Sequence, residues 1–208
     1  GLVVVPMLYL LTDAFAKKLC AFAQNGGTVI VTYWSGVVDE SDLCRLGDTP
    51  YGLTELLGLR RTEIDGMYDG ESRSCMPVAG CTLPAAQAST LCEVAALDEE
   101  NPAEPLSLYD EDYFAGHPAA AVHRYGKGRA YYLASRFDEA FYRAFYHDAA
   151  KEIGLNPAWP ETLPKGVLAV RRGSFVFVQN CTEQPVTVGN TVLDRYRTAV
   201  WKDMDRIF

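Results

Sequence analysis

Ser35 is the residue whose position first suggests nucleophilic chemistry. It stands in the stretch VIVTYWSG, residues 29–36, where a β-branched run typical of a buried strand breaks into a turn. A nucleophile elbow has small residues on both sides of its serine, in the pattern GxSxG, so that the backbone can turn sharply. Here Tyr33 and Trp34 precede Ser35, and only Gly36 is small. We therefore expect that Ser35 is not a nucleophile and that Ser35→Ala leaves stability and any hydrolase activity unchanged.

A catalytic base for such a nucleophile would have to come from one of three histidines. His117 precedes a proline in a predicted loop, His123 lies within a predicted strand, and His147 lies on a predicted helix. A structural role is the commoner one for each of them. A hydrolase that uses Ser35 or Cys44 with His117 or His123 stays open as an alternative at this point.

Carboxylates are frequent along the chain, and one pair has a spacing of interest. Glu63 and Asp65 are two positions apart, which would place them on one face of a strand. A retaining glycosidase needs two carboxylates about 5 Å apart, held on rigid strand ends. Most of the acidic residues instead fall in predicted loops, where a solvated surface is their usual role. The residues therefore assign no catalytic group.

The composition argues against several classes of function. A net charge of −8 and a pI near 4.9 argue against nucleic acid or anionic membrane as partner, because phosphates need a basic surface. No apolar run reaches the roughly 20 residues of a bilayer-spanning helix. No GxGxxG or Walker pattern is present, so we expect no nucleotide cofactor. The cysteines form no CxxC pair and have no histidine at ligand spacing, so we expect no metal.

The six cysteines are expected to be free thiols. A chain of 208 residues without a secretory signal is typical of a reducing compartment, where disulfides are rare. We therefore expect a cytoplasmic location. The cysteines are Cys20, Cys44, Cys75, Cys81, Cys92 and Cys181.

The first thirty residues have the pattern of a strand–helix–strand unit. Residues 2–5 form a short apolar run, and Thr12 is a suitable N-cap for a helix that ends at Asn25-Gly26-Gly27. A second apolar run follows at 28–33. Both runs are apolar on both faces, so we predict a mostly parallel sheet in which both are central strands. Because the chain opens on a strand, we expect the domain to be truncated at its N-terminus.

The remaining pattern divides the chain into two domains. A helix at 50–57, irregular surface at 66–90, a hairpin at 119–135 and a helix at 138–154 complete an α/β domain of residues 1–154. Three prolines in residues 155–166 indicate a linker. Alternating apolar and polar residues then predict a small antiparallel β-domain at 167–208.

Four stretches of the chain closely resemble the middle and closing parts of glycoside hydrolase family 42 β-galactosidases. They occur in the order and spacing of that family and cover nearly the whole chain. The tail KDMDRIF, residues 202–208, matches nothing in it. The stretches are LVVVPMLYLLTDAFAKKLCAFAQNGGTVIVTYWSGVVDESDLC, TELLGLRRTEIDGMY, YDEDYFAGHPAAAVHRYGKGRAYYLAS and FVFVQNCTEQPVTV.

The resemblance implies a fold and a function. Family members carry a catalytic (β/α)8 barrel, then a trimerisation domain similar to flavodoxin-like folds and class I glutamine amidotransferases, then a small β-domain. No stretch here corresponds to the barrel. The chain is thus expected to be the inactive oligomerisation portion of a homotrimeric β-galactosidase, whose barrel would bind terminal β-D-galactosides and hydrolyse them with retention. A stand-alone amidotransferase-like hydrolase, or an interaction module unrelated to sugars, is the alternative.

The resemblance also places Trp34 where the amidotransferases keep a nucleophilic cysteine. A tryptophan followed by Ser-Gly-Val-Val at a carboxyl edge of the sheet predicts an apolar patch, and such edges bind ligands and partners. We expect this patch to form a subunit interface or the rim of a neighbouring active site. Alternatively, Trp34 packs into its own core beneath residues 66–90. The residues assigned to the patch are Tyr33, Trp34, Val37, Val38 and Asp39.

Overall fold

The computed structural model describes residues 1–202, so most of the KDMDRIF tail lies outside the described residues. The chain divides into two compact units, Gly1–Ile153 and Gly154–Phe208. Each unit has a hydrophobic core of its own.

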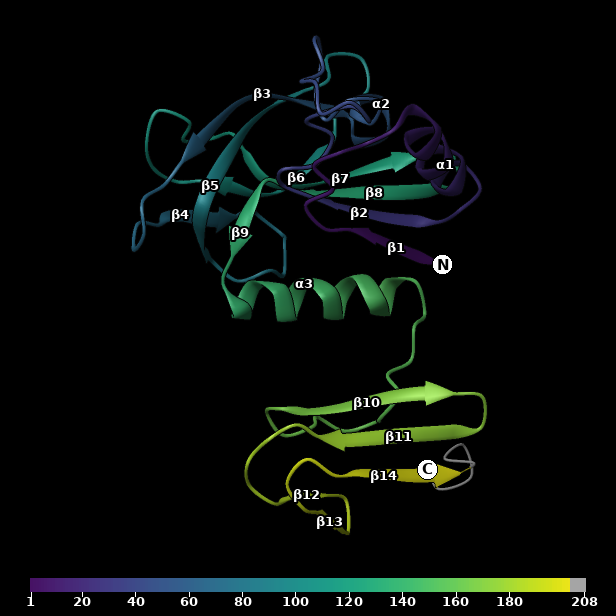
Figure 1. Cartoon of the computed structure of the whole chain (residues 1–208). Coiled ribbons are helices and arrows are strands. Elements are labelled where there is room, and N and C mark those ends of the chain that lie inside the picture. The colour runs from purple at the N-terminus through teal and green to yellow at the C-terminus, as the bar shows by residue number, and fades with distance from the viewer. Residues whose placement is uncertain (203–208) are drawn as a thin grey trace. The chain divides into compact units, whose positions relative to one another are not determined.

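Unit 1 is built on a nine-stranded mixed sheet in which only three neighbouring strands run parallel to one another. The others pair antiparallel, and β9 pairs with β5 off the main order (Figure 1). In sheet order the strands are β1 (Leu2–Val5), β2 (Thr28–Thr32), β8 (Gly128–Leu133), β7 (Pro118–Tyr125), β6 (Glu104–Tyr109), β4 (Arg73–Pro77), β5 (Ala86–Leu97) and β3 (Leu59–Gly66), with β9 at Ser135–Phe137.

The prediction of a mostly parallel sheet with two central strands is therefore wrong in part. β2 is central and every one of its residues is buried. β1, however, is the edge strand of the described sheet, and Val4 in its middle is 38% exposed. An apolar run reports burial of its side chains and not the number of strands beside it, so the pattern could not distinguish an edge from a centre.

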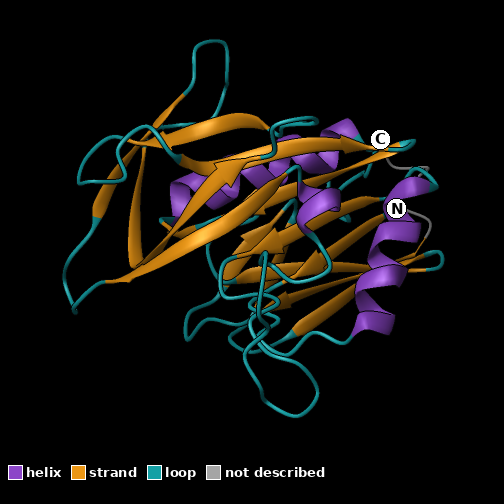
Figure 2. Cartoon of the chain, turned by 90° about the horizontal axis from the view of Figure 1, so that it is seen from above, coloured by secondary structure: helices purple, strands orange, loops and turns teal. Residues whose placement is uncertain are grey.

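Two helices cover opposite faces of this sheet. α1 (Asp13–Gln24) begins at Thr12, whose hydroxyl accepts a hydrogen bond from the amide of Phe15 at 3.3 Å. It buries Ala16, Leu19 and Ala23 against Val29 and Val31 of β2. α3 (Glu139–Glu152) packs on the other face, against Ile30. Figure 2 shows that strand predominates over helix in the chain.

The predictions for the three helices of unit 1 are confirmed in part. The spacing of Phe141, Phe145 and Ala149 predicts an apolar stripe on the last helix, and all three residues are buried in α3. In α1, the spacing of Phe15, Leu19 and Phe22 predicts one buried face, but Phe15 is 40% exposed. The third helix, α2 (Thr54–Leu57), begins four residues later than predicted and ends as predicted at Gly58, which has a φ of 61°.

The sequence pattern predicted only part of the antiparallel half of the sheet. The hairpin of β7 and β8 was predicted, with its turn at Gly126. Residues 66–90, predicted as irregular surface, instead contain β4 and the start of β5. Gly and Pro in this stretch end the strands without preventing them, since they fall mainly in the connecting turns.

Unit 2 is the small antiparallel β-domain that the alternation predicted. Its core includes Trp159, Val176, Val178, Val188 and Leu193. Trp159 belongs to the segment predicted as a linker and is 7% exposed, so this segment contributes to the core of unit 2. The strands are β10 (Val167–Arg172), β11 (Phe175–Asn180) and β14 (Thr198–Lys202) in one sheet, with β12 (Val186–Val188) and β13 (Thr191–Leu193) in a separate hairpin.

Candidate functional site

The turn after β2 adopts a backbone conformation that most side chains avoid. Trp34 has a φ of 58° and Gly36 a φ of 62°, both in the left-handed region. A left-handed residue other than glycine costs roughly 1–2 kcal/mol, so the surrounding structure must hold Trp34 there. The backbone amide of Trp34 donates a hydrogen bond to Oε1 of Glu93 at 2.9 Å. A side chain from β5 thus anchors the turn.

Glu93 is the centre of a buried polar cluster. Its side chain is fully buried and pairs with the guanidinium of Arg61 at 2.7 Å. The hydroxyl of Tyr132 donates to its second oxygen. Burial raises the pKa of Glu93, while Arg61, Tyr132 and the amide of Trp34 oppose this shift by favouring the ionised form. The sequence prediction missed this cluster, although a lone acid within the apolar run LCEVAAL was a signal for it.

Ser35 has a structural role in the same turn. Its side chain is wholly buried, and its hydroxyl oxygen accepts a hydrogen bond from the amide of Leu8 at 3.1 Å. Its carbonyl accepts another from Arg61 at 3.3 Å. A substrate cannot reach this hydroxyl. The expectation that Ser35→Ala would leave stability unchanged is not supported, because the variant would leave the Leu8 amide without its acceptor.

The structure does not assemble the alternative hydrolase. Nδ1 of His117 lies 3.0 Å from the carbonyl oxygen of Ala95, and Nδ1 of His123 lies 2.9 Å from that of Leu56. His123 is buried in the core beside Gly58. Within residues 1–202, no hydrogen bond joins Ser35 or Cys44 to a histidine. Both histidines hold backbone in place.

One member of the carboxylate pair of β3, Glu63, has a hydrogen-bond partner. Glu63 accepts a hydrogen bond from the hydroxyl of Tyr113 at 2.7 Å, and this bond raises the pKa of Tyr113 to about 12. Asp65 is half-buried. In the part of the chain that the structure describes, no group of three or more His, Cys, Asp or Glu side chains could hold a metal.

An apolar surface forms where β1 and β2 end. Because these strands are parallel neighbours, the segments that follow them emerge at the same edge. The amides of Gly36 and Val37 donate to the carbonyls of Leu8 and Tyr9, at 2.9 and 3.0 Å. The ring of Tyr9 stacks on that of Trp34 with centroids 6.0 Å apart. We call this the carboxyl-edge surface; it comprises Met7, Tyr9, Leu10, Trp34, Val37, Leu43 and Leu46.

The loop that carries half of this surface is held in place by two charged residues. Oδ1 of Asp39 accepts hydrogen bonds from the amides of Ser41 and Leu43, at 2.8 and 3.1 Å, which lower its pKa. Arg45 lies over the ring of Tyr51, 4.0 Å from its centroid, and pairs with Asp13 at 3.0 Å. Leu46, the next residue, is 94% exposed. The loop therefore presents an apolar side chain from an ordered backbone.

The structure divides the five residues assigned to the predicted patch. Trp34 and Val37 are half-buried on the carboxyl-edge surface, and Trp34 packs on Tyr9 instead of beneath residues 66–90. Tyr33 is 7% exposed and Val38 only 1%, so the prediction of an exposed Val38 is wrong. The backbone of Val38 pairs with that of Leu10 in an isolated β-bridge, and the side chain of Val38 points into the core. Asp39 organises the loop. The sequence prediction missed the other five residues of the surface, which are Met7, Tyr9, Leu10, Leu43 and Leu46.

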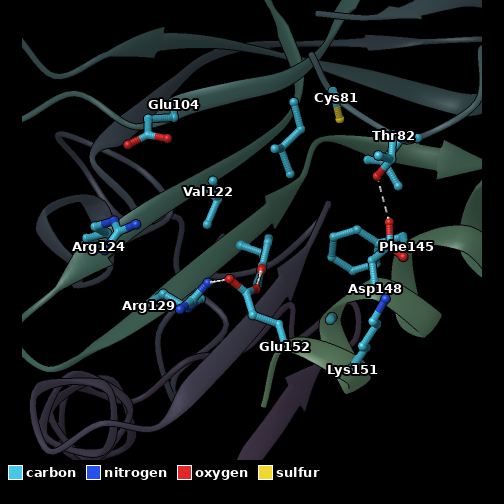
Figure 3. Close-up of a pocket in the computed structure, with 14 residues that line it drawn as sticks. Cys81, Thr82, Glu104, Val122, Arg124, Arg129, Phe145, Asp148, Lys151 and Glu152 are labelled. Atoms are coloured by element: carbon cyan, nitrogen blue, oxygen red, sulfur yellow. Dashed lines mark hydrogen bonds and ion pairs between the residues drawn. The ribbon is translucent and has the colours of Figure 1, made fainter. Parts of the chain in front are cut away.

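A cavity of about 620 Å³ lies on the face of the sheet that α3 covers. Figure 3 shows Asp148 and Glu152 each paired with another lining residue. Thr82 donates to Asp148 at 2.9 Å, and Arg129 pairs with Glu152. The lining, all within the described residues, contains the thiol of Cys81 but no histidine. The thiol of Cys81 therefore has no histidine base among the residues that line the cavity.

Among the described residues, no helix is both long enough and apolar enough to cross a membrane. All six cysteines are free thiols in the structure.

Comparison with known proteins places this chain in a family. The family described as the β-galactosidase trimerisation domain matches residues 1–156. The β-galactosidase BglY of Alicyclobacillus acidocaldarius is 44% identical over 190 residues, which cover 88% of this chain and 27% of that protein. The β-galactosidase Pbg of Clostridium perfringens is 36% identical over 199 residues, which cover 92% of this chain and 28% of that protein.

Solved structures agree with the sequence relatives. The crystal structure of the β-galactosidase from Rahnella sp. R3 has a TM-score of 0.85 and 38% identity, covering 96% of this chain and 32% of that one. Gan42B, a GH42 β-galactosidase from G. stearothermophilus, has a TM-score of 0.79 and 30% identity, covering 96% and 31%. The chain thus spans less than a third of the length of these relatives, and the resemblance stated from its sequence is confirmed. The chain belongs to the β-galactosidase trimerisation domain family.

Proposed function

We propose that this chain is the non-catalytic, trimerising portion of a longer β-galactosidase. The observation that carries the proposal is the family match over residues 1–156, which spans the whole of unit 1. In the longer protein, a (β/α)8 barrel would bind terminal β-D-galactosides and hydrolyse them with retention. The isolated chain has no turnover of its own. A cytoplasmic location belongs to this proposal and is supported by the six free thiols.

The finer fold assignment is part of the same proposal. Unit 1 is a flavodoxin-like domain related to class I glutamine amidotransferases. Its parallel strands β1, β2 and β8, and the left-handed φ of 58° at Trp34, support the relationship. In place of a nucleophile, the turn contains a tryptophan whose backbone amide donates a hydrogen bond to Glu93. The domain would then keep the elbow as a structural support.

The carboxyl-edge surface is the proposed contact with a neighbouring subunit. It groups exposed apolar side chains at the edge where open α/β sheets bind partners. Its aromatic stack of Tyr9 and Trp34 is the kind of anchor that protein interfaces favour. Trp34 and Val37 are also placed to rim the galactose pocket of that neighbour. An uncovered surface of this composition is unusual in a monomer.

A single charge placed on this surface tests the proposal. In the full-length protein, Leu46→Asp is expected to convert trimer to monomer in light scattering, with galactosidase activity lost at low protein concentration. Tyr68→Asp is the matched control, since Tyr68 is 84% exposed outside the surface, against 94% for Leu46. If Leu46→Asp leaves the oligomer and the activity intact, this surface is not the interface.

A further inference from the structure

The three-stranded sheet of unit 2 has an apolar side chain at most positions of its outer face. Its inner face carries Val176 and Val178 into the core. The strand register places Val170, Phe177 and Val200 in one row across β10, β11 and β14 on the opposite face. Leu168 and Phe175 belong to the same face by strand alternation. We call these five side chains the outer face; each is between 36 and 59% exposed.

This arrangement differs from that of a sheet with one face in water. Such an antiparallel sheet normally alternates apolar residues inward with polar residues outward. Here polar side chains occupy only the two ends of the face. Arg172 and Lys202 flank Phe175 at one end, and Gln179 and Thr198 lie beside Leu168 at the other. An apolar centre with a polar rim is the anatomy of an interface.

The relatives show how much polypeptide lies outside the matched region in the longer proteins. The alignment with the Clostridium perfringens β-galactosidase extends over 199 residues, so it must include most of unit 2, yet it covers 28% of that protein. In the Rahnella structure, the matched part is 32% of the chain. In these proteins the matched region, which includes the small β-domain, is therefore part of a much longer polypeptide. Polypeptide length of that extent is ample to bury an apolar sheet face.

We propose that the outer face packs against the portion of the full-length β-galactosidase chain that lies outside these 208 residues. This inference rests on the proposed function. The contacting surface would be apolar at its centre and would present a carboxylate to Arg172 and Lys202, both of which are exposed. Unit 2 would thus be a brace for the catalytic portion, separate from the subunit contact made by unit 1.

Radical footprinting with mass spectrometry tests this packing without any substitution. The 208-residue chain and the full-length protein are each labelled at two concentrations. Val170 and Phe177 are expected to be labelled in the isolated chain and to lose their labelling in the full-length protein. Val192 is the internal control, because it is 68% exposed on the β12–β13 hairpin and off the outer face; it should label equally in both.

Two outcomes would overturn the inference. If Val170 and Phe177 label equally in both proteins, nothing covers the outer face. If they become protected in the isolated chain as its concentration rises, a second copy is the occupant. Neither outcome depends on the trimer, whose test is the light scattering of Leu46→Asp, so failure of the two proposals can be told apart.

The melting temperature of a double variant gives an independent test. Leu168→Gln with Val170→Thr removes apolar contact at the two exposed apolar positions of β10 while keeping residues that a strand tolerates. The melting temperature of the isolated chain should not change, whereas that of the full-length protein should fall. Val192→Thr should change neither. An unchanged melting temperature in the full-length double variant would count against the packing.

Discussion

The carboxylate of Glu93 accepts a 2.9 Å hydrogen bond from the backbone amide of Trp34, a residue 59 positions away in the chain. The amide belongs to a turn with left-handed backbone, and Glu93 is a fully buried residue of β5. The same carboxylate neutralises Arg61, which donates to the carbonyl of Ser35. Glu93 therefore both neutralises the buried charge of Arg61 and fixes the backbone of the turn beneath the carboxyl-edge surface.

Removing this acid should be costly. Glu93→Ala leaves Arg61 as an uncompensated buried charge and the amide of Trp34 without an acceptor, so we expect a loss of about 3–5 kcal/mol in the free energy of unfolding. Glu104→Ala, at an exposed position of β6, should stay within about 0.5 kcal/mol of the parent. Urea denaturation of the isolated chain measures both. A loss below about 1 kcal/mol in Glu93→Ala would show that the cluster does not stabilise the fold.

The left-handed turn predicts an unusual order of stability for two substitutions at one site. Trp34→Ala and Trp34→Gly lose the same stacking on Tyr9, but only glycine adopts a φ of 58° without strain. We expect the glycine variant to be more stable than the alanine variant by about 1 kcal/mol. Thermal denaturation compares the two directly, and the opposite order would mean that the turn relaxes out of the left-handed region.

Ser35→Ala separates a structural hydroxyl from a catalytic one. The Leu8 amide loses its buried acceptor, so the free energy of unfolding should fall by about 1–3 kcal/mol. Galactosidase activity of the folded full-length variant should remain that of the parent. Ser41→Ala, an exposed position in the neighbouring loop, is the control and should change neither quantity. Esterase or amidase turnover that depends on Ser35 would restore the hydrolase alternative.

Asp138 should make the stability of α3 depend on pH. Partial burial raises the pKa of this N-cap, but hydrogen bonds from the amides of Gln87 and Phe141 outweigh it and leave the pKa below its ordinary value of 3.8. The folded state thus favours the ionised form. Its stabilisation, about 1 kcal/mol, is present above pH 3.8 and is lost as the pH falls through the lowered value. The stability difference between the parent and Asp138→Ala should therefore shrink in acid; a constant difference would refute this linkage.

The six thiols should fall into reactive and protected classes. Burial raises the pKa of Cys75 to about 12 and that of Cys92 to about 11, whereas Cys44 and Cys181 are exposed. At pH 8 the native chain should be alkylated at Cys44 and Cys181 and spared at Cys75 and Cys92, because the thiolate is the reactive form. Peptide mass spectrometry locates the modified residues, and denaturation without reductant should expose all six. Early labelling of Cys75 would contradict the buried assignment.

The sequence by itself determined the local elements and the family. The N-cap at Thr12, the stop at Gly58, the stripe of α3 and the β7–β8 hairpin follow from rules that act over a few residues, such as capping and side-chain periodicity. The resemblance to β-galactosidases rested on whole stretches in order, and the comparisons confirm it. The bulky neighbours of Ser35 predicted that it is not a nucleophile, and its hydroxyl is buried in the structure.

Only the tertiary structure decided how these elements meet. Whether β1 is an edge strand, which of Val37 and Val38 faces water, and that Tyr9 stacks on Trp34 depend on pairing between segments far apart in sequence. Glu93 pairs with Arg61, which is 32 positions away in the chain. The outer face of unit 2 becomes apolar only once three strands are in register. Burial and hydrogen bonding are properties of the assembled sheet, so no local rule could supply them.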